Sequence, residues 1–445
     1  ERLERKIGFR EITVREGQLW VNGQKVKLAG VNRHEIDPLT RRAATAKHAF
    51  EDARLFKGAN FNYIRTSHYP PTREFLDACD EIGLYVECEA PFCWTRAGRG
   101  EDDVHLDRDF LIPTAEMVRE HRGHPSIILW SLANESGEGP GGQNALPRNL
   151  ATTREYVHRV DPSRPVLFNN EWARDGGTCD VAVLHYPPWP PEGCEFVKDD
   201  PRPVLIDEYF PPQTFTQAET LQVNPGLDIV NWSTGQNGPS SFWSHVYASN
   251  RVIGGAIWAG IDEEFVLPGG KKVGYGPWGF IDVWRRPKSL WWDAKCIHSP
   301  VWIPLRRVDW NQGQMTLTIP IENRYSFTDL NELRVRWELG SKKGTCKVSL
   351  APGKSGILEV PVPMNARTGD LLILRFFDSN RTLVVAHGVT LGTLTEPEPP
   401  SARNGCPKWN QDDRTIKVEG QTFTLSVDRR TGEVSGGSIR LASLP

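Results

Sequence analysis

Hydrophobic and polar positions in this chain of 445 residues follow one period at the start and another further on. Up to about residue 29 they alternate, as at Ile12, Val14, Leu19 and Val21. Alternation of this kind is typical of half-buried strands, and Asn22-Gly23 is a favoured two-residue hairpin turn. Residues 1–29 are therefore predicted to be the end of a preceding β-sandwich domain.

From about residue 30 to residue 300, short apolar runs alternate with amphipathic stretches of helical period. The runs are VKLAGVN, FNYIRTS, GLYVECEA, SIILWSLANE, PVLFNN, VAVLHY, PVLIDEY and VIGGAIWAG. Eight strand–helix units over this length predict an α/β domain, a (β/α)₈ TIM barrel. A doubly wound open sheet is the alternative, but it usually has fewer strands and often a glycine-rich first turn, which this sequence lacks.

After residue 300 the helical period gives way to strand-like runs. The predicted strands are MTLTIPI, LRVRWEL, CKVSLAP, ILEVPVP, DLLILRFF and TLVVAHGVTL. They predict an immunoglobulin-like β-sandwich over 301–394. A proline-rich linker then spans 395–407, and 408–445 is the start of a C-terminal β-sandwich domain. Both ends look cut from a longer chain, so we expect any export signal outside this sequence, and the compartment stays open.

Composition narrows the classes of partner. Hydrophobic residues make up 38% and charged residues 24%, which favours folded cores over disorder. The net charge is −3, with both signs interspersed, so we expect neither nucleic acid nor membrane as a partner. The eight cysteines are dispersed and show no zinc-ligand spacing. A bridge between Cys179 and Cys194 is conceivable only in an exported protein.

Catalytic groups of TIM barrels lie at the carboxyl ends of the strands, so the polar residues that end each run are the candidates. Two carboxylates stand out among them, Glu135 after the fourth strand and Glu208 on the seventh. Hydrolysis of a glycosidic bond needs such a pair, one protonated and one ionised. Other polar residues at these strand ends are Asn32, His34, Arg65, His68, Asn134, His185, Tyr186, Asp207 and Trp258.

The segments GVNRHE, RTSHYP, WSLANESG and RPVLIDEYF, in their places on the strands, resemble glycoside hydrolase family 2. This family includes the LacZ-type β-galactosidases and the β-glucuronidases, and the resemblance covers nearly the whole chain. It implies a retaining, exo-acting β-glycosidase with Glu135 as acid/base and Glu208 as nucleophile. It also implies that Asn134 binds the sugar 2-hydroxyl, that Tyr186 and Arg65 hold Glu208, that His34 and His68 contact the sugar, and that Trp258 lies under its ring.

The sequence departs from the family at two ligand sites. Cys93 and Thr95 stand where LacZ-type enzymes hold Mg²⁺ with a Glu and a His, and neither is a ligand that Mg²⁺ prefers, so we predict no cofactor. Gly276 and Trp278 stand where β-glucuronidases bind the substrate carboxylate with Asn and Lys. A neutral hexose, galactose first, is therefore the predicted substrate, although Pro211 replaces a His of the LacZ-type 6-hydroxyl site.

Three alternatives remain open. A metal-dependent amidohydrolase would need a His-x-His after the first strand, where this chain has Asn32-Arg33-His34. A carbohydrate-binding module would have no need for both glutamates. The chain is also predicted to lack most of the N-terminal sandwich that lines family 2 substrate pockets, so it would be inactive if that domain is essential. Homo-oligomerisation of a full-length protein stays open.

Overall fold

The computed structural model describes residues 6–43, 45–93, 106–135, 145–169, 178–187, 197, 199–209, 239–393, 407–420, 423–430 and 434–435. The chain divides into two compact units, Glu1–Gly392 and Thr393–Pro445. The first unit holds the barrel and the sandwich that follows it, and the second holds a small β-sheet.

The barrel is an eight-stranded parallel sheet in the order β8-β7-β6-β5-β4-β11-β10-β9. Its two end strands, β8 and β9, pack against each other and so close the ring. Every predicted apolar run forms one strand, and the predicted TIM barrel is confirmed. The bounds are β4 Leu28–Arg33, β5 Tyr63–Thr66, β6 Tyr85–Glu89, β7 Ile127–Asn134, β8 Val166–Asn169, β9 Ala182–His185, β10 Val204–Tyr209 and β11 Val252–Ile257.

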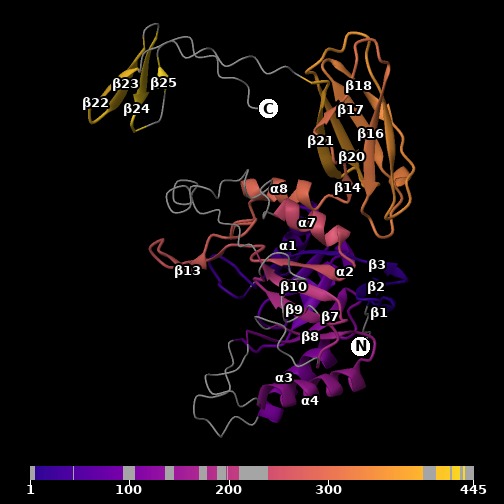
Figure 1. Ribbon diagram of the computed structural model, residues 1–445. Helices are drawn as coiled ribbons and strands as arrows, with labels where there is room; N and C mark the ends of the chain where they lie inside the picture. The colour runs from indigo at the N-terminus through magenta and orange to yellow at the C-terminus, as the bar shows by residue number, and fades with distance from the viewer. Residues whose placement is uncertain are drawn as a thin grey trace. The chain divides into compact units, whose positions relative to one another are not determined.

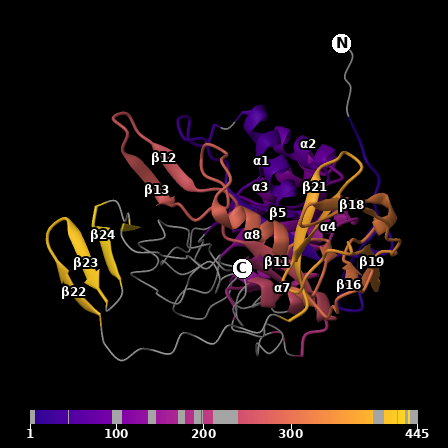
Figure 2. The ribbon, with the colours of Figure 1, turned by 90° about the horizontal axis from the view of Figure 1, so that it is seen from above.

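Helices surround these strands (Figures 1 and 2). Helix α1 shows why they form: Thr45 caps its first turn by accepting a hydrogen bond from the backbone N–H of His48, and Ala49, Ala53 and Phe56 recur on its buried side. All eight residues of β7 are buried, because strands of a barrel have covered faces on both sides. The helices are α1 Ala46–Gly58, α2 Arg73–Ile82, α3 Leu106–His121, α4 Ala145–Val160, α7 Pro239–Ala248 and α8 Ser289–Ile297.

An N-terminal sheet packs against the amino ends of the barrel strands. Strands β1 Ile12–Arg15, β2 Gln18–Val21 and β3 Gln24–Lys25 pair antiparallel, with positive φ at Asn22 and Gly23 in the predicted hairpin turn. Leu19 and Val21 of β2 join an apolar cluster that contains Leu28, Leu129 and Leu205 near the starts of β4, β7 and β10. The amino end of the barrel is thus apolar, which leaves the carboxyl end for polar groups.

A short antiparallel hairpin follows β11. Its strands are β12 Glu263–Val266 and β13 Lys272–Gly276, and both views show it extending away from the barrel strands (Figures 1 and 2). The first residue of β12, Glu263, is buried at the base of this hairpin.

The sandwich has two sheets around one apolar core. The alternation in LRVRWEL is confirmed, since Val335 and Leu339 are buried while Arg334 and Arg336 are exposed. One sheet contains β14 Val301–Trp302, β16 Thr316–Asn323 and β19 Ser355–Pro361; the other contains β15 Arg307–Val308, β17 Arg334–Leu339, β18 Lys342–Cys346, β20 Leu371–Phe377 and β21 Leu383–Leu391, and a 3₁₀ turn spans Leu330–Glu332.

One predicted strand of the sandwich is wrong. CKVSLAP contributes only Cys346, and the strand lies earlier, at β18, which pairs with β17 in the register Leu339↔Lys342 to Val335↔Cys346. Gly340, with φ of 57°, turns the chain directly back after β17. Because β18 is an edge strand with mostly exposed side chains, it shows no apolar alternation that would have revealed it.

The second unit is a four-stranded antiparallel sheet. It consists of β22 Lys408–Gln411, β23 Thr415–Glu419, β24 Thr424–Asp428 and β25 Val434–Ser435. The predicted pair TIKVEG and QTFTLSVD corresponds to β23 and β24. In the described part of the chain, no helix combines the length and apolarity needed to cross a membrane.

Candidate active site

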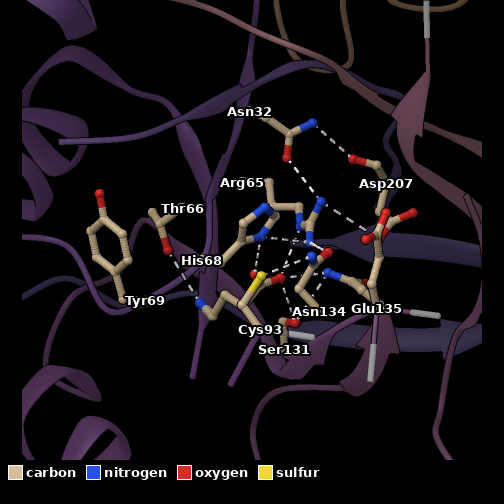
Figure 3. Close-up of polar contacts among 12 residues, drawn as sticks. Asn32, Arg65, Thr66, His68, Tyr69, Cys93, Ser131, Asn134, Glu135 and Asp207 are labelled. Carbon is tan, nitrogen blue, oxygen red and sulfur yellow. Dashed lines mark hydrogen bonds and ion pairs between the residues drawn. The ribbon is translucent and has the colours of Figure 1, made fainter. Parts of the chain in front are cut away.

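The polar residues that the sequence places at the strand ends meet at the carboxyl end of the barrel. Arg65 lies on β5, Asn134 ends β7, and Glu208 lies on β10. Arg65 is completely buried at the centre of this group, with Asn32, His68, Asn134 and Asp207 around it (Figure 3). It donates to Oε2 of Glu208 at 3.0 Å, to Oε2 of Glu89 at 2.8 Å, and to the side-chain oxygens of Asn32 and Asn134 at 3.0 and 2.5 Å.

Glu208 is held at both carboxylate oxygens. Tyr186 donates its hydroxyl to Oε1 at 2.8 Å, while Arg65 donates to Oε2. Burial by itself would raise the pKa of Glu208, but the cations of His185 and Arg65 outweigh it and lower the pKa to about 2. A carboxylate that stays ionised and is fixed in position is what a nucleophile requires.

A β-bulge brings a second carboxylate beside Glu208. Strand β10 pairs with β9 at Ile206↔Leu184 and next at Glu208↔His185, so Asp207 is an extra residue in the register. Neighbouring side chains of a regular strand point to opposite faces, yet here Asp207 and Glu208 both reach His185. Each ring nitrogen has a carboxylate neighbour. Nδ1 lies 3.1 Å from Oδ1 of Asp207, and Nε2 lies 3.3 Å from Oε2 of Glu208.

Glu135 faces the same ring nitrogen of His185 as Glu208 does. Its Oε1 is 2.9 Å from Nε2 of His185, and one of its carboxylate oxygens lies within 4.8 Å of one of Glu208. Glu135 has a φ of 39°, a left-handed conformation that is costly for a non-glycine residue. Its side chain is 28% exposed against 8% for Glu208, so Glu135 is the carboxyl group that faces solvent and an incoming substrate.

An aromatic wall lies beside this pair. The ring of Trp258 stacks on His68 with centroids 5.2 Å apart, and the ring of His34 meets both edge-on at 5.4 and 5.5 Å. Glu89 fixes His68, because its Oε1 lies 2.8 Å from Nδ1 of that ring while Oε2 binds Arg65. Glu89 therefore supports two residues of the site at once.

Sequence reasoning did not assign two further groups. Glu263 is buried, its Oε1 lies 3.9 Å from Nε2 of His34, and its carboxyl group accepts a hydrogen bond from the Trp278 side chain. Burial raises the pKa of Glu263 to about 8 in spite of Arg42 nearby. Arg42 donates to Nδ1 of His34 at 3.1 Å and also contacts the Tyr69 hydroxyl. Glu263 lies beyond the end of β11, at the start of β12. The search for polar residues at the ends of the barrel strands therefore did not include it.

The residues at the LacZ-type Mg²⁺ position do not suit that ion. Burial raises the pKa of Cys93 to about 11, so its sulfur is a neutral thiol, and it accepts a hydrogen bond from Asn134 at 3.4 Å. Thr95 lies outside the described residues. Mg²⁺ prefers hard oxygen ligands with carboxylate charge among them, which a thiol does not supply.

The donor atoms of Glu135, His185 and Glu208 lie close enough together to raise the question of a metal ion. Burial lowers the pKa of His185, but Asp207 and Glu208 outweigh burial and raise that pKa well above 6.5. Among the described residues, these three groups are joined to one another by hydrogen bonds and ion pairs.

Comparison with known proteins agrees with this geometry. Residues 12–190 match the family model described as glycosyl hydrolases family 2, TIM barrel domain. Residues 12–190 belong to glycoside hydrolase family 2. Among curated relatives, the β-galactosidase of Alteromonas mediterranea is 30% identical over 402 residues, and that of Aeromonas hydrophila is 28% identical over 388 residues.

These alignments cover 82% and 79% of this chain, but only 35% and 34% of the relatives, so the chain spans about a third of their length. Solved structures share the fold. A family 2 β-galacturonidase from Eisenbergiella tayi superposes with a TM-score of 0.52 at 23% identity, covering 66% of this chain and 55% of that one. A β-glucuronidase from Parabacteroides merdae gives 0.55 at 16% identity, covering 97% and 57%.

Proposed function

We propose that this chain carries the catalytic centre of a retaining β-glycosidase that releases terminal β-D-galactose. The observation that supports this most directly is the carboxylate pair. Oxygens of Glu135 and Glu208 lie within 4.8 Å of each other, in line with the short spacing of retaining enzymes and below the roughly 6.5–9.5 Å of inverting ones.

The two carboxyl groups have environments suited to different tasks. Glu208, ionised and held by Arg65 and Tyr186, would attack the anomeric carbon while Glu135 gives its proton to the leaving oxygen. Water would then attack the anomeric carbon of the glycosyl ester, giving a proton to Glu135 as the bond to Glu208 breaks. Asn134, fixed by Arg65 and Cys93, would bind the sugar 2-hydroxyl, and Trp258 would lie under the ring.

Support for a neutral hexose comes from Glu263. Its buried carboxyl beside His34 is suited to hydrogen bonds with sugar hydroxyl groups. Arg42 is the observation that favours the alternative, a β-glucuronidase or another β-glycosidase, because an exposed guanidinium at this wall is able to pair with a uronate. The curated relatives named above are β-galactosidases, which favours galactose.

We further propose that the centre works without a bound Mg²⁺, since the Cys93 thiol replaces a hard ligand. Activity should then survive chelation, and added Mg²⁺ should not increase it. A chelator-sensitive activity that Mg²⁺ restores would contradict this proposal.

A panel of aryl β-galactoside, β-glucuronide, β-glucoside and β-mannoside tests the function. We expect turnover of the galactoside, loss of turnover in Glu208→Ala, and rescue of Glu135→Ala by azide, which attacks the glycosyl ester without needing a base. An active Glu208→Ala variant would overturn the assignment. Preference for the glucuronide would shift the proposal to a uronidase. An inert wild-type chain would require the same panel on a longer chain, since the curated relatives are about three times as long as the aligned part.

A further inference from the structure

His185 lies between the two catalytic carboxylates, and its environment is strongly anionic. Its Nε2 faces Oε1 of Glu135 at 2.9 Å and Oε2 of Glu208 at 3.3 Å, and its Nδ1 faces Oδ1 of Asp207 at 3.1 Å. The side chain is 1% exposed, so water does not screen these charges. A neutral imidazole has one N–H, whereas this ring has anionic partners at both nitrogens, which favours the imidazolium.

The other groups packed around the ring do not remove this preference. Tyr186 follows it directly, just past the end of β9, with ring centroids 5.2 Å apart. Arg65, the cation on the facing strand β5, is 3.0 Å from Glu208 and 3.7 Å from Asp207, and it is shared with Glu89. Two catalytic carboxyls and Asp207 therefore face one imidazole and one guanidinium.

During a double displacement, one negative charge moves between the two catalytic carboxyl groups. His185 has a single N–H at Nε2, which is able to pair with whichever group carries that charge. In the resting enzyme Glu208 is ionised and Glu135 carries a proton. When Glu208 forms the ester bond to the anomeric carbon, the leaving oxygen takes its bonding electron pair and the proton of Glu135. Glu135 is then the anion and Glu208 is neutral, until water returns a proton to Glu135 and the electron pair returns to Glu208. The pair carries one negative charge at each of these stages.

We propose that His185, held as an imidazolium by Asp207, is a positioning residue that passes its Nε2–H hydrogen bond from Glu208 to Glu135 and back as this charge moves. The two acceptor distances differ by only 0.4 Å (3.3 against 2.9 Å), so a small movement of the ring is enough. This inference rests on the proposed retaining mechanism. It assigns His185 the task of stabilising the carboxylate charge in both half-reactions, which Arg65 and Tyr186 perform for Glu208 alone.

The first test needs no turnover. Nitrogen NMR of the histidine rings in the intact chain, with the His185 signals identified by their loss in His185→Gln, reports its protonation directly. We expect an imidazolium at neutral pH in the wild type and in Glu135→Gln and Glu208→Gln, since one carboxylate partner remains in each. In the double variant Glu135→Gln/Glu208→Gln, the pKa of His185 should fall further than in either single variant. A neutral His185 at pH 7 in the wild type would overturn the inference.

The second test uses the pH profile of kcat/KM for an aryl β-galactoside. Removing a cation between two carboxyls raises the pKa of both, so in His185→Gln the acid limb and the alkaline limb should both move to higher pH, by about one unit. His185→Met, which lacks the donor as well, should show the same displacement and a lower kcat. A purely structural histidine would lower activity without moving both limbs.

His158→Gln is the matched control. His158 also pairs with an aspartate, Asp180, at 2.9 Å, but it lies on α4 and contacts none of the catalytic groups named above. Its substitution should leave the pH profile unchanged. Unmoved limbs in both His185 variants, with circular dichroism showing an intact fold, would refute the inference. An imidazolium at position 185, together with lack of turnover of every glycoside by both this chain and a longer one, would count against the proposed function and not against this inference.

Discussion

Substitution of Tyr186 by phenylalanine removes one hydrogen bond from the candidate nucleophile and little else. The hydroxyl donates to Oε1 of Glu208 at 2.8 Å, and the side chain is 44% exposed, so no cavity forms in the core. When the glycosyl ester is hydrolysed, negative charge returns to Glu208, and this hydrogen bond strengthens as it does so. A hydrogen bond to a charged group contributes about 1.5–3 kcal/mol. At about 1.4 kcal/mol per tenfold change in rate, the hydrolysis step should slow by about 10-fold to about 150-fold.

The measurement is steady-state kinetics with a galactoside whose leaving group is good enough to make ester hydrolysis rate-limiting. We expect kcat to fall by the factor above and KM to fall with it, because the glycosyl-enzyme accumulates. Tyr156→Phe serves as the control, since Tyr156 is a half-buried tyrosine on α4 beside Arg119 and Arg159. A Tyr186→Phe enzyme with wild-type kcat and an unchanged melting temperature would refute the assigned role of this bond.

Three further predictions follow from the charges of the site. The pKa of Glu89 is lowered to about 2 in the folded chain, so its contribution to stability is complete above its ordinary pKa of 4.5 and is lost as the pH falls toward 2. Urea unfolding measured across this range should show a smaller decrease in the free energy of unfolding for Glu89→Gln than for the wild type. The pKa of Glu263 is raised from 4.5 to about 8, so stability is lost as the pH rises from 4.5 to 8, and the loss is complete above 8. Glu263→Gln should therefore be more stable than the wild type at pH 9, while its KM for the galactoside rises. An unchanged KM would remove Glu263 from the sugar site. Arg65→Met should unfold at a urea concentration lower by the equivalent of about 3–5 kcal/mol, because it leaves buried carboxylates without their cation, and a variant as stable as the wild type would contradict the charge network.

Much of the fold follows from local patterns in the sequence. Apolar runs alternating with amphipathic stretches predicted each of the eight barrel strands, and Asn22-Gly23 predicted the first hairpin turn. These features depend on neighbours a few residues apart, and the burial of whole strands makes the runs easy to see. The exposed edge strand β18 was missed because no buried face imposes a period on it.

In the candidate site, too, the residues could be predicted from the local sequence, but some of their contacts could not. The rule that barrel chemistry lies at the carboxyl ends of the strands singled out Glu135 and Glu208, and the resemblance to family 2 proposed their roles and those of Arg65 and Tyr186. His185 and Asp207 also stand at strand ends, but their joint contact depends on a bulge in β10, which is set by pairing with β9 and not by the local sequence.

The sequence by itself determined which residues reach the mouth of the barrel, because strand ends follow from hydrophobic periodicity. Only the tertiary structure decided which charges meet there. It placed Glu263 against His34, which lies at the end of a strand far away in the sequence, and it placed His185 between Glu135 and Glu208. The physical reason is that electrostatic energies in a buried site depend on separations of a few ångströms and on exclusion of water, and these are fixed by strand register, bulges and packing across the whole barrel.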